Sequence, residues 1–433
     1  MPSRRWFAPG QAPWLPLCSA AMTESVSAPA EAFAESANAP ARPDIHLMAG
    51  RDKRLRLGHP WVYSNEIRMN EAARALPAGG LVRLIAPDGA GLGTAIFNPH
   101  TLIAARRLTS ETDAIIDRSF FARPLRRALA LRDRLFDRPF YRLIHAEADG
   151  LPALVIDRFG EVVVVQANAA GMDRLLPELL AAIDSVLEPA AVVLRNDSPT
   201  RALEGLEPET RLIKGTLDGL VRLEENGAVF FADPLGGQKT GWFYDHRDNR
   251  AFMARLSGGA RVLDLYTYHG GFAIQAALAG AARVEAVDRS EAALASAARA
   301  AEANGVSALC GFHRADAFAE LERLADAGER FDVVVADPPP FARAKKDVAA
   351  ASRAYRKLAR LGARVTARGG LLLVASCSHN IDPGTFVDLV AYGVADAQRN
   401  GRIIRQAGAA PDHPVHPLLP ETAYLKAVVV HLD

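Results

Sequence analysis

The sequence predicts an α/β protein whose C-terminal half is a doubly wound sheet, preceded by a small β-barrel and a small α+β module. Strand-like apolar runs alternate with helical segments from about residue 223 onward, which is the pattern of a parallel sheet. The pair Gly270-Gly271 separates one such strand from the next helix, as in sheets that bind nucleotides. Short runs with turn signals between residues 81 and 108 predict the barrel.

Length and composition fit a protein of several domains. The chain has 433 residues, 49% hydrophobic and 23% charged, and contains no apolar run long enough to span a bilayer. Because 51 Lys and Arg face 50 Asp and Glu, any affinity for nucleic acid must come from local basic patches. Cys18, Cys310 and Cys377 have no pairing or metal-type spacing, so we expect a cytoplasmic protein without a metal or a membrane anchor.

Residues 1–43 are rich in Ala, Pro, Ser and Glu and lack periodicity, which predicts a disordered extension. Arg4-Arg5 and the apolar residues after it imitate a signal peptide, but prolines at positions 9, 13 and 16 interrupt the apolar core. We favour a start at Met22 over export of the protein.

Residues 44–115 are expected to form the barrel, with strands at 81–86, 92–97 and 102–108. A basic run leads into two aromatic residues near its start: Arg51, Lys53, Arg54, Arg56, Trp61 and Tyr63. Cations bind phosphates and aromatic faces stack on unpaired bases, so this run predicts an RNA contact. The alternative is a solvated basic turn with Trp61 in a small core.

Residues 116–222 are expected to form the α+β module. Residues 118–137 have apolar positions at helical spacing and many arginines, which predicts a surface helix. Strands are expected at 141–144, 153–157 and 162–167, with a hairpin turn at 158–160, followed by a helix at 172–187 and strands within 191–222. Composition alone assigns this module no chemistry.

Residues 223–433 are expected to carry the doubly wound sheet. Its strands are predicted at 262–266, 284–287, 309–314, 332–336, 371–376 and 424–431. Its helices are predicted at 272–278, 291–304, 345–366 and 384–398. In open α/β sheets, ligands bind at the carboxyl ends of the strands, so the residues that follow these strands are the candidates for a site.

Asp264, the turn Gly270-Gly271 and Asp288 describe a nucleoside-binding edge. The glycines allow close approach of the backbone, and the Asp288 carboxylate at the end of the second strand can accept both ribose hydroxyls. Residues 266–271 lack the Gly-x-Gly-x-x-Gly pattern that a pyrophosphate needs, so S-adenosylmethionine fits better than NAD. Asp316 either faces the adenine amino group or serves as an ordinary helix N-cap.

The run Val333-Val334-Val335-Ala336-Asp337-Pro338-Pro339-Pro340-Phe341 predicts a buried strand that stops abruptly. Prolines fix φ and leave their carbonyls without neighbouring N–H donors. The loop can therefore present Asp337, backbone carbonyls and the Phe341 ring to a flat, polar ligand. A proline-rich exit from a strand is the structural alternative.

An apolar strand at 371–376 ends beside Cys377, which places a thiol at the same sheet edge as Asp337. Methylation of a pyrimidine at C5 needs a nucleophile that first adds to C6, and a thiolate suits this step. Asp337 would hold N3 and the exocyclic amine of cytosine. The base has to be flipped to reach the cleft, where Phe341 is a candidate stacking surface. Cys310 is expected to be inert packing.

Several motifs together resemble one known family. They are His59-Pro60-Trp61-Val62-Tyr63-Ser64, Asp149-Gly150-Leu151-Pro152, Asp157-Arg158-Phe159-Gly160, Gly237-Gln238-Lys239-Thr240-Gly241-Trp242-Phe243-Tyr244-Asp245-His246-Arg247, Tyr268-His269-Gly270-Gly271-Phe272, Asp337-Pro338-Pro339-Pro340-Phe341, Ser376-Cys377-Ser378 and Asp412-His413-Pro414. Nearly everything after residue 44 resembles the bacterial class I S-adenosylmethionine-dependent large-subunit (23S) rRNA cytosine-C5 methyltransferases. That family joins an N-terminal PUA domain to a Rossmann-like catalytic domain. It usually has Gln at the position of His246 and Thr or a small residue at that of His269.

The resemblance implies Cys377 as the nucleophile and Asp337 as the acid that holds the base. It implies a cofactor pocket lined by Asp264, Tyr266, Tyr268, Gly270, Gly271, Phe272, Asp288 and Asp316. Lys239, Thr240 and Arg247 are expected at the edge of this pocket or on the RNA path, and Pro338, Pro339 and Phe341 beside the RNA base. The implied partner is large-subunit rRNA, and a homodimer stays open.

Three other functions are compatible with parts of the sequence. An exocyclic-amine methyltransferase would use the Asp-Pro-Pro-Pro-Phe loop without a covalent adduct, leaving Cys377 as packing. An RNA-binding assembly factor without turnover would use residues 51–63 alone. An NAD-dependent oxidoreductase is disfavoured because the glycine fingerprint is missing.

Overall fold

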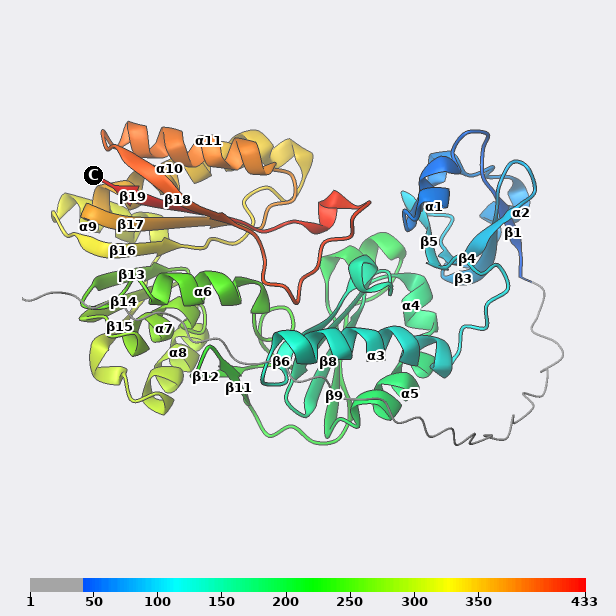
Figure 1. Cartoon of the computed structure of the whole chain (residues 1–433), viewed down its shortest axis with the longest axis horizontal. Helices are drawn as coiled ribbons and strands as arrows, with labels where there is room; N and C mark the ends of the chain where they lie inside the picture. Colours follow the sequence, from blue (N-terminus) through cyan, green and yellow to red (C-terminus); the bar gives the residue numbers. More distant parts are fainter. Residues whose placement is uncertain (1–41) are drawn as a thin grey trace, which may run out of the picture. The chain divides into compact units, whose positions relative to one another are not determined.

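Residues 42–433 are described by the computed structural model and divide into three modules along the chain (Figure 1). The predictions for residues 1–41, among them the disordered extension, the start at Met22 and the state of Cys18, lie outside the described residues. Among the helices of residues 42–433, none combines the length and the apolar character that a membrane span requires.

The N-terminal module is a five-stranded sheet in the order β1-β3-β4-β5-β2. Its strands are β1 (Asp44–His46), β2 (Trp61–Tyr63), β3 (Gly80–Ile85), β4 (Gly91–Phe97) and β5 (Ile103–Thr109), and its helices are α1 (Lys53–Leu57), η1 (Ser64–Glu66) and α2 (Glu71–Arg74). One bridge between Leu47 and Ile67 joins the segments that follow β1 and η1. The expected barrel is therefore a curled sheet without a continuous closing ladder.

The middle module is a five-stranded sheet in the order β10-β9-β8-β7-β6. Its strands are β6 (Phe140–His145), β7 (Leu154–Phe159), β8 (Val162–Ala167), β9 (Ala191–Asn196) and β10 (Glu209–Lys214). Its helices are α3 (Arg118–Leu135), η2 (Ala146–Asp149), α4 (Ala170–Arg174), α5 (Leu176–Leu187) and η3 (Pro199–Glu204). Phe159 pairs with Val162, so the hairpin turn is formed by Gly160 and Glu161 rather than by residues 158–160.

The two faces of the middle sheet have different partners. Helices α3 and α5 pack on one face, where Phe121 and Leu179 join Ile156 in a common apolar core (Figure 1). On the other face, Phe159 and Val164 belong to the same core as residues of the C-terminal module. The middle module is thus packed against the C-terminal module through buried apolar side chains, which contribute about 25 cal/mol per Å² of buried area.

The C-terminal module contains a seven-stranded sheet in the order β15-β14-β13-β16-β17-β19-β18. Its strands are β13 (Arg261–Leu265), β14 (Arg283–Asp288), β15 (Cys310–Arg314), β16 (Phe331–Ala336), β17 (Thr366–Ser376), β18 (Gly401–Ala407) and β19 (Lys426–Leu432). Strands β13 to β17 are parallel, and β19 is antiparallel to both neighbours. The strand order reverses between β13 and β16, and ligands bind at such switch points.

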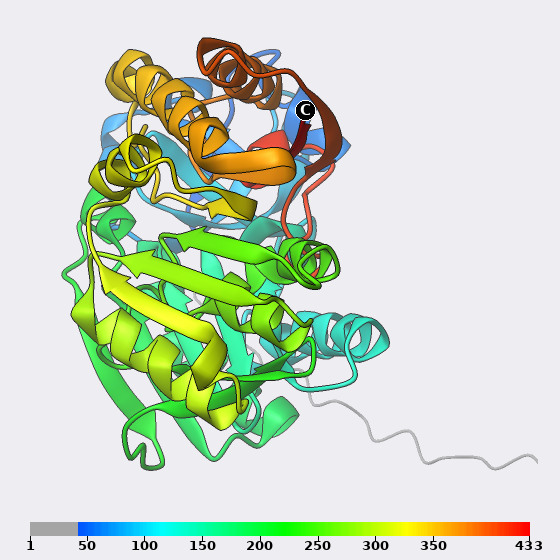
Figure 2. The same ribbon diagram turned by 90° about the vertical axis from the view of Figure 1, so that its left-hand side faces the viewer.

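Helices cover both faces of this sheet, which confirms the doubly wound prediction (Figure 2). One face packs against α6 (Arg247–Ala254), α7 (Gly271–Leu278), α8 (Glu291–Ala303) and the hairpin of β11 (Val221–Glu225) and β12 (Ala228–Ala232). The other face packs against α9 (Ala317–Asp326), α10 (Val348–Val365) and α11 (Pro383–Asp396). Short 3₁₀ turns lie at η4 (Tyr244–His246), η5 (Ser307–Leu309), η6 (Lys345–Asp347) and η7 (Pro420–Thr422).

Four elements were not predicted from the sequence: α6, α9, β18 and the β11–β12 hairpin. The hairpin had a usable signal, because Asn226 and Gly227 both have positive φ and Asn-Gly favours a two-residue turn. Strand β18 had none, because most of its residues are exposed and it lacks an apolar alternation. Strand β17 also begins five residues before the expected start, at Thr366.

Candidate active site

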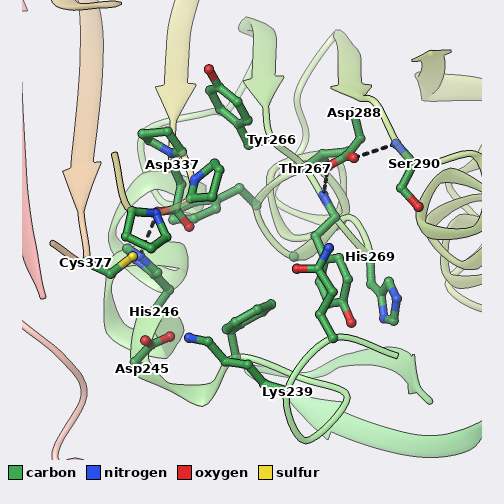
Figure 3. A pocket seen from close by; sticks show the side chains of 18 of the residues that line it. Lys239, Asp245, His246, Tyr266, Thr267, His269, Asp288, Ser290, Asp337 and Cys377 are labelled. Carbon is green, nitrogen blue, oxygen red and sulfur yellow. Dashed lines mark hydrogen bonds and ion pairs between the residues drawn. The ribbon is translucent and has the colours of Figure 1, made fainter. Parts of the chain in front are cut away.

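A cavity of about 600 Å³ lies at the carboxyl ends of the parallel strands (Figure 3). Tyr266 follows β13, Asp288 ends β14, Asp337 follows β16 and Cys377 follows β17, and all four line this cavity. Other predicted residues in its wall are Lys239, Tyr268, Gly271, Phe272, Asp316, Pro338, Pro339 and Phe341. The structure thus brings together most of the residues that the sequence pointed to.

Asp288 organises the cofactor side of the cavity. One of its carboxylate oxygens accepts a hydrogen bond from the Tyr268 N–H at 2.9 Å, and the other accepts one from the Ser290 N–H at 2.9 Å (Figure 3). The Tyr268 ring stacks on the His269 ring with centroids 3.7 Å apart, and both rings face the cavity. Burial lowers the pKa of His269 to about 4, so its imidazole is neutral at pH 7.

Hydrogen bonds to the Asp264 carboxylate hold the glycine turn in place. The carboxylate accepts hydrogen bonds from the Thr267 hydroxyl at 2.6 Å and from the Ala273 N–H at 3.0 Å. Burial raises the pKa of Asp264 to about 7. Gly270 has φ +80°, and a Cβ there would lie 3.1 Å from the Cβ of Ala297, so the turn requires glycine. Asp264 and Gly270 shape the turn and do not line the cavity.

Asp316 combines the two roles that the sequence left open. Its carboxylate caps α9 by accepting hydrogen bonds from the Phe318 N–H at 3.0 Å and the Ala319 N–H at 3.2 Å. Its side chain also lines the cavity. The capping role is therefore observed, and contact with an adenine amino group stays a prediction.

Asp337 is paired with His246 at the opposite side of the cavity (Figure 3). His246 Nε2 lies 3.2 Å from Asp337 Oδ1, and its Nδ1 lies 3.2 Å from the side-chain nitrogen of Asn249. Because that nitrogen donates its other hydrogen to the Gly408 carbonyl, the arrangement favours an imidazole with its proton on Nε2, directed at Asp337. Burial acts to lower the pKa of His246, but Asp337 and Asp245 outweigh it and raise that pKa.

Cys377 lines the cavity and is partly exposed to it. Burial raises the pKa of its thiol to about 11, and the Asp337 charge adds to this effect, whereas Lys239 opposes it. The flanking Ser376 and Ser378 hydroxyls both lie 2.9 Å from the Tyr355 hydroxyl. These hydrogen bonds fix the backbone on either side of the thiol.

The proline loop is held by Ser378 and by Tyr355, which contacts both serines. The Ala342 N–H donates a hydrogen bond to the Ser378 hydroxyl at 3.2 Å. The Phe341 ring packs against Tyr355 and Phe318, with centroids 4.7 and 6.1 Å away. The loop that carries Asp337 and the segment that carries Cys377 therefore share one rigid support.

Lys239 reaches the cavity from the loop between β12 and η4. Its ammonium lies 4.6 Å from the centroid of the Phe243 ring. The loop is held by Arg195 of β9, which donates hydrogen bonds to the Pro234 carbonyl at 2.8 Å and the Gly237 carbonyl at 2.7 Å. The middle module thus positions a cation in the wall of the cavity.

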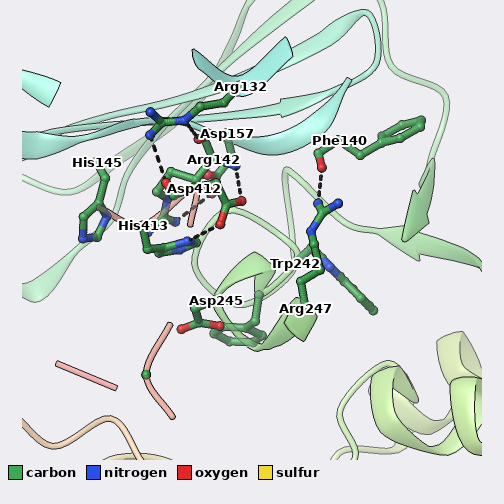
Figure 4. Close-up of polar contacts among 12 residues, drawn as sticks. Arg132, Phe140, Arg142, His145, Asp157, Trp242, Asp245, Arg247, Asp412 and His413 are labelled. Atoms are coloured by element: carbon green, nitrogen blue, oxygen red, sulfur yellow. Dashed lines mark hydrogen bonds and ion pairs between the residues drawn. The ribbon is translucent and has the colours of Figure 1, made fainter. Parts of the chain in front are cut away.

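Thr240 and Arg247 contact the middle module and do not line the cavity wall; Figure 4 shows Arg247 at this junction. The buried Thr240 hydroxyl donates to Asp157, which also forms a bidentate pair with Arg142 at 2.8 Å. Arg247 donates a hydrogen bond to the Phe140 carbonyl. Both side chains join segments that are distant in sequence. These contacts within the protein account for their positions, and no bound ligand is needed to explain them.

Two of the four cations of the N-terminal basic run are paired with carboxylates. Arg54 pairs with Glu66 at 2.8 Å, and Arg56 pairs with Asp52 at 2.6 Å and Asp88 at 2.8 Å. Among residues 42–433, Arg51 and Lys53 have no carboxylate within 4.0 Å and are exposed. The indole N–H of Trp61 donates to Glu147 of the middle module at 2.7 Å, so that ring joins two modules. RNA binding by this run stays a prediction.

Sequence analysis missed several polar residues of the cavity wall. Gln238, Asp245, Arg250, Arg289 and Ser290 all line it. Asp245 accepts a hydrogen bond from the Tyr424 hydroxyl at 2.6 Å. Gln238 and Asp245 lie within the family motif at residues 237–247, and Arg250, Arg289 and Ser290 lie within three residues of a predicted site residue.

Comparisons with known proteins identify the chemistry of this fold. Residues 45–110 match the PUA-like domain family, and residues 205–429 match the family of S-adenosylmethionine-dependent methyltransferases. The chain is 37% identical over 393 residues to ribosomal RNA large subunit methyltransferase I of Shewanella denitrificans, covering 90% of this chain and 99% of that protein. The chain belongs to this methyltransferase family. The protein of the same name from Photobacterium profundum gives the same identity and coverage.

Solved structures share the fold of this methyltransferase. A Streptococcus mutans protein described as a SAM-dependent methyltransferase gives a TM-score of 0.76 at 19% identity, covering 90% of this chain and 100% of that one. A second methyltransferase structure, in complex with SAH, gives 0.77 at 20% identity with the same coverage. These likenesses concern the fold, and they confirm the Rossmann-like prediction for the C-terminal module.

The cofactor of the methyltransferase is S-adenosylmethionine, and the cavity fits it. Asp288 stands where a ribose is bound at the end of the second strand of such sheets, and the turn at residues 266–271 lacks the glycine pattern that a pyrophosphate needs. Aromatic side chains line the space between Asp288 and Cys377, which suits an adenosine and a sulfonium. Among residues 42–433, no group of His, Cys, Asp and Glu has the arrangement of a metal site.

Proposed function

We propose that this methyltransferase acts on large-subunit rRNA and forms 5-methylcytosine through a thiolate adduct of Cys377. One observation carries the proposal: Cys377 and Asp337 line the cofactor cavity together, so closely that the carboxylate charge contributes to the raised pKa of the thiol. C5 methylation of cytosine needs a nucleophile that adds to C6, and the Cys377 thiol can supply it, whereas methylation of an exocyclic amine needs no thiol.

In the proposed reaction, the Cys377 thiolate adds to C6 of cytosine and forms a C–S bond. The electrons of the C5–C6 double bond shift toward N3, which takes up a proton, and C5 becomes nucleophilic. When bound, S-adenosylmethionine would supply the methyl group and leave as S-adenosylhomocysteine. Carbon C5 then carries both its hydrogen and the new methyl group. Water then takes the C5 proton and the N3 proton, the electrons of the C–S bond return to the sulfur, and the aromatic base and the Cys377 thiolate are restored.

In the proposed reaction, Asp337 serves N3 and the exocyclic amine of the base. Its Oδ1 is occupied by His246, and its side chain remains 27% exposed toward the cavity. A carboxylate oxygen accepts hydrogen bonds from an amine and from a protonated N3, and both occur in the cytosine adduct. Uracil carries a carbonyl in place of the amine, so the same oxygen would repel it.

The product nucleoside tests the proposal. Purified protein, labelled S-adenosylmethionine and unmodified large-subunit rRNA should give 5-methylcytidine, identified by mass spectrometry after digestion. An N-methylated nucleoside would leave the fold and the cofactor intact but overturn the proposed role of Cys377. A cytoplasmic location, a homodimer, and the proposed boundaries at residues 43, 115 and 222 stay predictions.

We expect the single-turnover methylation rate to rise with pH. The thiolate is the reactive form, and the pKa of Cys377 is about 11. Roughly one thiol in 10⁴ is therefore ionised at pH 7, and the rate should grow about tenfold per pH unit up to pH 9. Single-turnover kinetics measure this step without product release. A rate that stays flat over this range would contradict thiolate formation as the limiting step.

His246 is expected to orient Asp337 through its Nε2–H. Replacing His246 by Ala should lower kcat by about 10- to 100-fold, because a hydrogen bond to a charged group contributes roughly 1.5–3 kcal/mol. His246→Gln retains an N–H donor at a similar reach and should recover most of kcat. The KM for S-adenosylmethionine should change little in both variants. Equal losses in the two variants would show that packing, not the hydrogen bond, matters at this position.

A further inference from the structure

Helix α3 of the middle module carries an arginine face that the catalytic site does not use. Its exposed arginines Arg123, Arg126, Arg127 and Arg134 fall within an arc of about 100° when each residue turns the helix by roughly 100°. The opposite side of α3 is buried and holds Phe121, Leu125, Ala128 and Arg132. We call the four exposed arginines the α3 arginine face.

These four arginines have no carboxylate within 4.0 Å among residues 42–433, unlike Arg54 and Arg56 of the N-terminal run. Three carboxylates of α3 and its neighbourhood accept hydrogen bonds from neutral donors and form no ion pair with these arginines. Asp117 caps the helix, Asp133 accepts a hydrogen bond from the Tyr141 hydroxyl, and Glu178 accepts one from the Arg118 N–H. The whole chain has a net charge of only +1, so the positive charge on this face of α3 is a local excess and does not reflect the overall composition.

We propose that the α3 arginine face binds the phosphate backbone of the RNA substrate, which makes the middle module a second RNA-binding element. The guanidinium group forms two parallel hydrogen bonds with a phosphate and keeps its charge at any physiological pH. From Arg123 to Arg134 the helix extends about 16 Å, over which one strand of a duplex carries on the order of five phosphates.

The buried side of α3 ties this surface to the catalytic module. Arg132 donates to both carboxylate oxygens of Asp149 at 2.9 and 2.7 Å and to the Asp412 carbonyl of the C-terminal module at 3.0 Å (Figure 4). Asp412 also accepts a hydrogen bond from the Arg142 N–H of β6 at 3.0 Å. RNA bound on α3 is therefore held in a fixed geometry relative to the segment that completes the catalytic module.

The inference rests on the RNA substrate of the proposed function and is independent of the atom that is methylated. Its test is the salt dependence of binding between the full-length protein and unmodified large-subunit rRNA. The variant R123Q/R126Q/R127Q/R134Q should reduce the slope of log affinity against log salt by about three, because each phosphate contact contributes roughly 0.7–0.9. The KM for rRNA should rise while kcat at saturating rRNA stays near that of the wild type.

A matched control removes four exposed arginines that do have carboxylate partners: Arg314, Arg323, Arg356 and Arg364. This variant should keep the wild-type slope. An unchanged slope in the α3 variant overturns the inference, and Leu131 and Leu135, which are also exposed on α3, would then favour a protein partner. Equal losses in both variants also overturn it, because total charge would explain them. Absence of RNA binding by the wild type would instead contradict the proposed function.

Discussion

Replacing Cys377 by Ala is expected to abolish methylation of large-subunit rRNA, with a loss on the order of 10⁴-fold or more in kcat. Without the thiol no adduct forms at C6, and C5 of cytosine remains a poor nucleophile. Binding of S-adenosylmethionine should persist, because the groups at the Asp288 side of the cavity are unchanged. Methyl incorporation from labelled cofactor measures the first effect, and isothermal titration with the cofactor measures the second.

Cys310 provides the matched control. Its thiol also has a pKa raised to about 11 by burial, but it lies at the start of β15 and not in the cavity wall. Cys310→Ala should therefore retain activity within about twofold, apart from a small loss of stability from the missing sulfur. Substantial methylation by Cys377→Ala would contradict the covalent mechanism and favour methylation of an exocyclic amine.

Replacing Asp337 by Asn should lower kcat by about 10²- to 10³-fold, the effect of removing one preorganised group that stabilises the transition state. Asn is nearly isosteric but neutral, so it stabilises a protonated N3 less well than the carboxylate does. Its amide can also pair with uracil, which carries N3–H and a carbonyl, so the activity on uracil relative to cytosine should increase. Parallel assays on two RNAs that differ only in the target base measure both effects.

The unfolding temperature of Asp337→Asn serves as its control, since the side chain is partly exposed and the fold should survive. Wild-type kcat in this variant would show that Asp337 is part of the proline-rich exit from β16 without a role in the reaction. A lost cofactor affinity would place Asp337 on the methionine side of the cavity instead of the base side.

The sequence could predict the candidate site because its residues follow apolar strands. Tyr266, Asp288, Asp337 and Cys377 each come directly at the end of such a run, and parallel strands bring their carboxyl ends to one edge. The local sequence pattern and the rule that parallel strands share one carboxyl edge are therefore sufficient to predict these four residues. The same reasoning explains why six of the seven strands of this sheet were predictable and why the exposed edge strand β18 was not.

Contacts between modules could not be predicted. Thr240 reaches Asp157, and Trp61 reaches Glu147, across 83 and 86 positions of sequence. The local sequence pattern around each residue does not indicate its partner. The two polar groups of such a pair become buried and form their hydrogen bond only when the modules pack together. The pair of His246 and Asp337 depends in the same way on η4 and β16 meeting at the cavity.

The most direct test of the account uses rRNA transcribed with 5-fluorocytidine in place of cytidine. The C5–F bond cannot release a proton, so an adduct between Cys377 and C6 should persist after methyl transfer and survive denaturing electrophoresis. We expect a covalent protein–RNA complex with the wild type and the Cys310→Ala variant, none with Cys377→Ala, and a peptide carrying the nucleotide on Cys377 in mass spectrometry. Methylation of ordinary rRNA to 5-methylcytidine without such a complex, or a complex that survives Cys377→Ala, would contradict the assignment of Cys377 as the nucleophile.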